Sequence, residues 1–308
     1  MTPGVPDFFG QLLEADPEIA LQPFELDLPL KAGPLHKIQY VIEFVGQRSV
    51  LAGAAAQLLA PDWYQALGHP LVFAMRPADL QWQRLTPAID GSYDSLAMSW
   101  PLLGPQGAIN HTSAKHLLEL AERFGPYIQR RAMAMPVPRE IDAYVRVLKQ
   151  TQESLDIGFE ISVLSSQASF AEKDLWVECA RLGLSFSPTG SFDWRVPSHP
   201  SPLFSVTPIG QTDAFSLANV QRGATHVGVT VGFSVPLCPA PTQAAEGAFY
   251  AAEHIARELD GRILDDSNRE LSDLIKNQLL ANLREAISLF AKVGMTTGSS
   301  ETMALFGR

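Results

Sequence analysis

The sequence predicts an α+β fold made of two tandem split β-α-β type units, each a mainly antiparallel sheet packed on helices with one sheet face open. Two observations lead to this prediction. Runs in which apolar and polar residues alternate, typical of half-buried strands, are separated by segments with helical spacing. Landmarks also repeat: Trp100 and Val235, each followed by Pro-Leu, lie 135 positions apart, and Gly125 and Gly261, each after a helical segment, lie 136 apart.

The first half of the chain begins with a Pro-rich segment, residues 1–35, which we interpret as a linker or tether. The first unit follows as residues 36–136. Its run IQYVIEFV, residues 38–45, alternates Ile38, Tyr40, Ile42 and Phe44 against Gln39 and Glu43, and this period of two predicts a strand. The other elements are predicted as a helix over 49–60, strands over 70–77, 80–85 and 93–103, and a helix over about 111–124 that ends at Gly125.

The second half repeats this pattern as a unit of residues 156–293, after a connecting helix within 137–155. Its elements are predicted as a strand over 157–164, a helix over 170–184, strands over 186–196, 203–208 and 226–237, a helix over 243–259, a short strand, and a last helix that ends near Lys292. Residues 294–308 are predicted to form a tail.

Composition excludes several classes of protein. The formal net charge of -10, without a Lys/Arg-rich run, argues against nucleic-acid binding. Cys179 and Cys238 fit neither a zinc site nor a disulfide framework, and we expect two buried thiols in a reducing compartment. No stretch approaches 18 consecutive apolar residues and the start lacks a signal peptide, so we expect neither export nor a membrane span within this chain.

Catalytic and metal-binding motifs are also missing from the sequence. It contains no Gly-rich phosphate loop, zinc-protease motif or nucleophile elbow. His111 and His116 are poorly spaced to share one helical face, and His254 falls off the apolar stripe of its helix, where we expect it at the surface. We therefore predict no catalytic residue, metal ligand or cofactor.

Asp265 and Asp266 raise the question of an acid pair. Adjacent residues on a strand point to opposite faces, so the two carboxylates do not easily converge on one proton or one metal ion. The next residues, 267–270, have the S-x-x-E form of a capping box, and Ser272 is another candidate N-cap for the last helix. We interpret the two acids as the turn before that helix, with a catalytic or metal role as the alternative.

The stretch HIARELDGRILDDSNRELS, residues 254–272, resembles the helix, Gly, strand and Asp-Asp turn near the end of the ZipA C-terminal domain, the cell-division module that binds the FtsZ tail. FEISV, LFSVTP and GVTVGFSVP occur in the order of that family's strands. The resemblance covers about residues 156–292, and its most specific parts are GVT at 228–230, VP at 235–236 and LDD at 264–266. The whole chain is similar to a longer variant of the family with an additional preceding domain.

This resemblance implies a non-enzymatic adaptor that captures the C-terminal peptide of FtsZ on a shallow apolar groove across an exposed sheet face. Such an adaptor helps to tether and stabilise the Z ring at the cytoplasmic face of the bacterial inner membrane, through an anchor not present in this chain. By motif position, Ile209 and Phe233 fall at positions that line the groove in this family. Ser205 and Thr207 lie on the same side of their strand as Ile209, and Val231 lies on the same side of its strand as Phe233. The alternation of Val227, Val229, Val231, Phe233 and Val235 with polar residues favours a second interpretation, in which this row packs into the core.

Two further functions remain open from the sequence. A module of the same fold could dock a different protein through residues 36–136, with Trp82 and Trp100 as candidate contacts. A small-molecule or enzyme site between the two halves is the other alternative, and it rests only on the general tendency of ligands to lie between domains.

Overall fold

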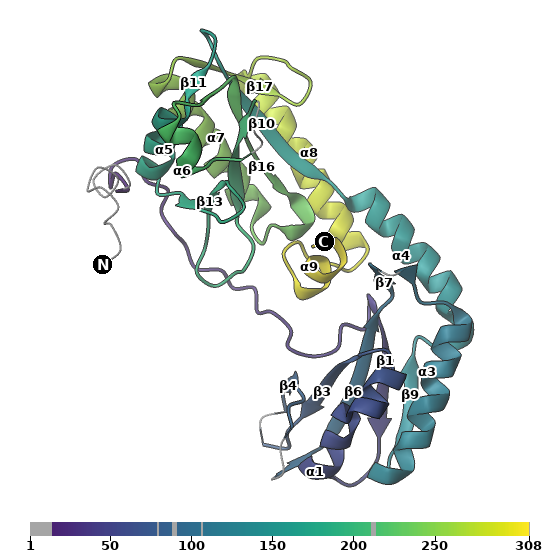
Figure 1. Ribbon diagram of the computed structural model, residues 1–308. Coiled ribbons are helices and arrows are strands. Elements are labelled where there is room, and N and C mark those ends of the chain that lie inside the picture. Colours follow the sequence, from purple (N-terminus) through teal and green to yellow (C-terminus); the bar gives the residue numbers. More distant parts are fainter. Residues whose placement is uncertain (1–13, 79, 88–90, 106, 211–213, 308) are drawn as a thin grey trace, which may run out of the picture. The chain divides into compact units, whose positions relative to one another are not determined.

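The computed structural model describes residues 14–307 except 79, 88–90, 106 and 211–213. The chain divides into two compact units (Figure 1). The C-terminal unit contains residues 14–28 and 155–302, and the N-terminal unit contains residues 29–154 and 303–307. Each combines helices with an antiparallel sheet, so the predicted α+β fold class is confirmed.

The N-terminal unit is built on a five-stranded antiparallel sheet of order β4-β3-β6-β1-β9. Its strands are β1 (Gln39–Val45), β3 (Leu71–Met75), β4 (Trp82–Arg84), β6 (Ser95–Pro101) and β9 (Arg131–Met135). Two separate short pairs also form: β2 (Val50–Leu51) pairs with β5 (Ser92–Tyr93), and β7 (Leu103–Gly104) pairs with β8 (Gly107–Ala108). Its helices are α1 (Ala52–Ala55), η1 (Ala56–Leu59), α2 (Pro61–Ala66), α3 (His111–Phe124), η2 (Gly125–Ile128), η3 (Pro138–Glu140) and α4 (Ile141–Leu155). The rings of Phe44 and Phe124 lie 5.8 Å apart, which places α3 on the sheet face that carries Phe44.

The C-terminal unit contains a six-stranded sheet of order β12-β13-β14-β16-β10-β17. Its strands are β10 (Gly158–Ser165), β12 (Ser185–Phe186), β13 (Phe192–Trp194), β14 (Phe204–Ile209), β16 (Gly228–Ser234) and β17 (Gly261–Asp265), and a separate pair joins β11 (Phe170–Ala171) to β15 (Thr225–His226). Its helices are α5 (Glu172–Arg181), α6 (Leu217–Gln221), η4 (Val235–Leu237), α7 (Pro241–Glu258), α8 (Asp273–Lys292) and α9 (Ser300–Phe306), the last of which runs on into the residues grouped with the N-terminal unit.

The two sheets repeat the same arrangement. Strands β3-β6-β1-β9 correspond to β14-β16-β10-β17, and the pair β2–β5 corresponds to β11–β15. In chain order, α3 lies between β6 and β9 as α7 lies between β16 and β17. The outer hairpins differ, because β4 follows β3 whereas β13 precedes β14. This common order supports an internal duplication.

Helix α7 packs closely on one face of the C-terminal sheet. Phe159 stacks on Phe233 with ring centroids 5.0 Å apart, and Phe249 of α7 meets Phe159 edge-on at 5.5 Å. The buried side of α7 consists largely of alanines. A Cβ on Gly247 would lie 2.6 Å from the ring of Trp194, so the helix needs glycine at this point. Among the described residues, the face opposite α7 carries mostly half-buried and exposed side chains.

Several predicted elements differ from the structure. The helix predicted over 49–60 starts only at Ala52, because Val50–Leu51 pair with β5, and it continues from Ala56 as the 3-10 helix η1. Pro61 favours the extended conformation of Ala60, which separates η1 from α2. The strand predicted over 186–196 is divided into β12 and β13 by a turn in which Gly190 has φ +82. The predicted tail, residues 294–308, contains α9.

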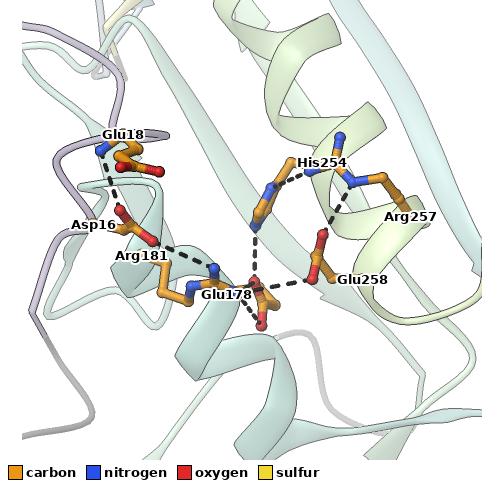
Figure 2. Close-up of polar contacts among 7 residues, drawn as sticks. All are labelled: Asp16, Glu18, Glu178, Arg181, His254, Arg257 and Glu258. Carbon is orange, nitrogen blue, oxygen red and sulfur yellow. Dashed lines mark hydrogen bonds and ion pairs between the residues drawn. The ribbon is translucent and has the colours of Figure 1, made fainter.

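The predicted tether also differs from the structure. Residues 1–13 lie outside the described residues, but residues 14–24, here called the N-terminal strap, pack on the C-terminal unit. Two backbone N–H groups of the strap donate to carbonyls at the end of α5, at 3.0 Å each. Figure 2 shows the carboxylate of Asp16 meeting Arg181, at 3.3 Å. Phe24 lies edge-on to Trp194, with ring centroids 5.8 Å apart.

We predict that Phe24→Ala lowers the free energy of unfolding of the full chain by about 1–2 kcal/mol, because it removes an aromatic pair and its buried area. Urea unfolding followed by tryptophan fluorescence measures the change. The exposed neighbour supplies the control, and Glu25→Ala should change stability by less than about 0.5 kcal/mol. Equal stabilities for the two variants would contradict the packed strap.

Candidate functional site

The candidate partner-binding surface is the face of the C-terminal sheet opposite α7, called the open face below. Strand pairing sets its outward residues in three rows across β14, β16, β10 and β17. The first row is Ser205, Gly232 and Glu160; the second is Thr207, Thr230, Ser162 and Leu264; the third is Ile209, Gly228, Leu164 and Arg262. Apart from Gly228, these residues are half-buried or exposed. The surface is therefore accessible and mainly polar, with an aliphatic part at one end.

Three of the five predicted binding residues share this surface. Ser205, Thr207 and Ile209 occupy successive rows of β14. Val231 and Phe233 have the opposite parity on β16. Val231 is fully buried, whereas Phe233 is half-buried, stacks on Phe159 and also belongs to the lining of the hollow described below. The structure thus removes Val231 from the predicted groove. The cause is the pleat, since β16 pairs with β14 in a register that puts Val231 opposite the buried Val206.

A hollow of about 430 Å³ lies at one end of the open face, where β10 begins and β16 ends. Gly232 contributes no side chain to it. Its polar lining comes from the hydroxyls of Ser205, Thr207, Thr230 and Ser234 and from the carboxylates of Asp156 and Glu160. Hydroxyl groups both donate and accept hydrogen bonds, and exposed carboxylates attract cations. This end of the open face can accept a polar or cationic group.

A buried carboxylate borders the first row. The hydroxyl of Ser205 donates to Asp193 at 2.7 Å, and Ser191 donates to the same oxygen at 2.8 Å. The other oxygen of Asp193 accepts from the guanidinium of Arg195 at 2.6 Å. Asp193 is thus neutralised within the sheet, and its partners fix the position of the Ser205 hydroxyl.

Asp265 and Asp266 do not form an acid pair. The side chain of Asp265 is buried and accepts from the backbone N–H and the guanidinium of Arg269, at 2.7 and 2.6 Å, whereas Asp266 is exposed. Burial raises the pKa of Asp265, but the hydrogen bonds and charge of Arg269 outweigh it and hold the pKa below its ordinary value. Helix α8 starts with Ser272 as its N-cap, at 3.4 Å from the N–H of Ile275, so residues 267–270 do not cap it.

Two carboxylate–imidazole pairs lie around α5, away from the open face. Glu178 meets the Nε2 of His254 at 2.8 Å, and Glu172 meets the Nε2 of His226 at 2.7 Å. In Figure 2, Arg257 reaches the other ring nitrogen of His254, at 3.1 Å. Because a guanidinium only donates, that nitrogen of His254 accepts, and Nε2 is placed to donate to Glu178. The surface position expected for His254 is wrong, since α5 packs on α7 and covers it.

The N-terminal unit does not offer Trp100 as a contact. Trp100 is buried, and its Nε1 donates to the carbonyl of Leu67 at 2.8 Å. Trp82 is half-buried against Gly33. The N–H of Leu35 donates to the side chain of Gln39, which lies on the face opposite α3. Residues 33–35 thus cover part of the sheet face that corresponds to the open face.

The described residues hold three further findings. They contain no group of three His, Cys, Asp or Glu side chains placed to bind a metal ion. Cys179 and Cys238 are both buried thiols, as predicted. Within the same part of the chain, no helix has the length and apolar character needed to cross a membrane.

Comparison with protein families gives one match. Residues 158–282 match the model described as ZipA, C-terminal FtsZ-binding domain. This segment belongs to the ZipA family. The match includes β10 to β17 and the first half of α8, and therefore all three rows of the open face. ZipA C-terminal domains are protein-binding modules rather than enzymes, and the match assigns the C-terminal unit an FtsZ-binding role in cell division. A search of curated proteins found no match to the chain.

Most open-face residues lie outside the five predicted ones. Thr230, Gly232 and Leu264 were missed, although each follows from the period-two alternation once one buried residue of its strand is known. For β16 the alternation of the sequence favoured the core for the row of Val229 and Val231, and both are fully buried in the structure.

We predict that Asp265→Asn destabilises the protein by about 2 kcal/mol at pH 7, because the charge-assisted hydrogen bonds to Arg269 are lost. Asp266→Asn is the matched control and should cost less than about 0.5 kcal/mol. Since the folded-state pKa of Asp265 is depressed, its stabilisation is complete above the ordinary value of about 3.9 and is lost as pH falls through the lower folded-state pKa. Denaturation midpoints between pH 7 and pH 2.5 measure this; a constant difference across that range would contradict it.

Proposed function

We propose that the C-terminal unit binds the C-terminal tail peptide of FtsZ on its open face, without catalysing a reaction. The observation that carries the proposal is an accessible sheet face lying wholly within the segment that matches the ZipA C-terminal FtsZ-binding domain. Ser205, Thr207 and Ile209 are the proposed contacts from β14. A short peptide on a surface of this size is expected to bind with a Kd of about 1–100 μM.

The face suits an extended peptide better than the sheet edges do. Beyond β17, Leu264 bridges to Glu270, and the N–H of Leu271 donates to the carbonyl of Ile263, so the returning chain occupies that edge. The opposite edge strand, β12, has only two residues. Strand addition at an edge needs a longer free ladder of backbone groups. Recognition is therefore proposed through side chains on the face.

We further propose that this binding helps to hold and stabilise the Z ring at the cytoplasmic face of the inner membrane. An FtsZ-binding domain has this effect when the chain that carries it is attached to the membrane, because attachment raises the local concentration of the captured filaments. The attachment itself is not assigned to any described helix.

We predict that Ile209→Asp weakens binding of a labelled FtsZ C-terminal peptide at least about tenfold, because a charge replaces an aliphatic contact on the open face. Fluorescence anisotropy with the full chain measures the Kd. Leu274→Asp is the control, since Leu274 is 78% exposed on α8, outside the open face, and its replacement should change the Kd less than about twofold.

The proposal fails if the unmodified protein does not bind the peptide saturably at high-micromolar concentration. Equal losses for Ile209→Asp and Leu274→Asp would instead move the binding surface away from the open face.

A further inference from the structure

The open face of the C-terminal unit has opposite charges at its two ends. The first row ends in the exposed Glu160, and Asp156 lies beside it in the lining of the hollow. The third row ends in the exposed Arg262. Two residues along a strand span about 6.6 Å, so the first and third rows are about 13 Å apart. A bound segment therefore meets a negative end and a positive end within a few residues.

The acidic end is not neutralised by the protein. Within the described part of the chain, neither Asp156 nor Glu160 has an ion-pair partner. Asp193, which borders the same row, differs because it is buried and paired with Arg195 at 2.6 Å. The negative potential at the hollow thus comes from Asp156 and Glu160, with nearby hydroxyls of Ser205 and Thr230 able to accept further hydrogen bonds.

The far end of the face is aliphatic. Ile209 and Leu164 flank Gly228 in the third row, and Leu264 lies in the neighbouring second row. Gly228 carries no side chain, so the two aliphatic side chains have only a backbone strand between them. These three residues supply the apolar contact that a small interface needs.

From this arrangement we infer that the open face selects an extended segment with a Lys or Arg side chain in the hollow beside Glu160 and Asp156, and an aliphatic side chain about four residues away against Ile209 and Leu164. The spacing follows from about 3.3 Å per residue over about 13 Å. Charge complementarity then fixes the direction of the bound segment, because reversal would put its cationic residue beside Arg262. This inference rests on the proposed function and adds the chemistry of the recognised segment.

The test compares two variants with the same change of charge. Glu160→Lys reverses the charge at the hollow, and Glu285→Lys reverses an exposed charge on α8, outside the open face. Kd values for the labelled FtsZ C-terminal peptide are measured with the full chain at about 50 and 300 mM salt. We expect Glu160→Lys to weaken binding about tenfold at low salt and to reduce the salt dependence, and Glu285→Lys to change the Kd less than about twofold.

A charge swap completes the test. Each Lys or Arg of the peptide is replaced in turn by Glu, and one such peptide should bind Glu160→Lys at least about fivefold more tightly than it binds the unmodified protein. Circular dichroism checks that the variants are folded, and Asp156→Asn supplies a milder change at the same site. If the unmodified protein binds but Glu160→Lys and Asp156→Asn bind equally well, the inference is overturned and the proposed function stands. If the unmodified protein does not bind, the proposed function itself fails.

Discussion

The close packing of α7 on the C-terminal sheet is the constraint from which the rest of the site follows. Alanines and Gly247 let the helix approach the sheet, where Trp194 and the stacked Phe159 and Phe233 fill the interface. Because side chains alternate along each strand, covering one face commits every second residue to the core and leaves the remainder to solvent. A shift of one residue in β16 would put Val231 on the open face in place of Thr230. The surface proposed to bind FtsZ is in this sense defined by the helix on its other side.

Much of the fold could be predicted from the sequence, because alternation and helical spacing are local signals. The central strands, the long helices and the resemblance to the ZipA family all rested on such signals. Motif position placed Val231 and Phe233 at the groove, whereas the alternation of apolar and polar residues favoured the core, where Val231 lies. The pair of Glu178 and His254 was also missed, because 76 residues separate its members and no local pattern connects them.

The internal duplication has not produced two equivalent surfaces. Both sheets share the order of four strands and the helix before the last of them, yet the corresponding faces differ in what covers them. Residues 33–35 lie on the N-terminal sheet. Val41 is fully buried there, although it lies on the face away from α3, opposite to the face that carries Phe44. In the C-terminal sheet the same face carries hydroxyls, a hollow and unpaired charges. Accessibility, rather than fold, distinguishes the two copies.

The N-terminal strap also determines how the chain is assembled. Since residues 14–24 pack with residues 155–302, the N-terminal unit is an insertion within the sequence of the C-terminal unit. Asp16 meets Arg181, which lies 165 positions later in the sequence. The strap therefore packs only after α5 has been synthesised and has left the ribosome. The N-terminal unit, apart from its last few residues, is synthesised before the C-terminal unit can fold completely. A fragment that starts at residue 155 contains the whole open face yet omits a part of its own domain.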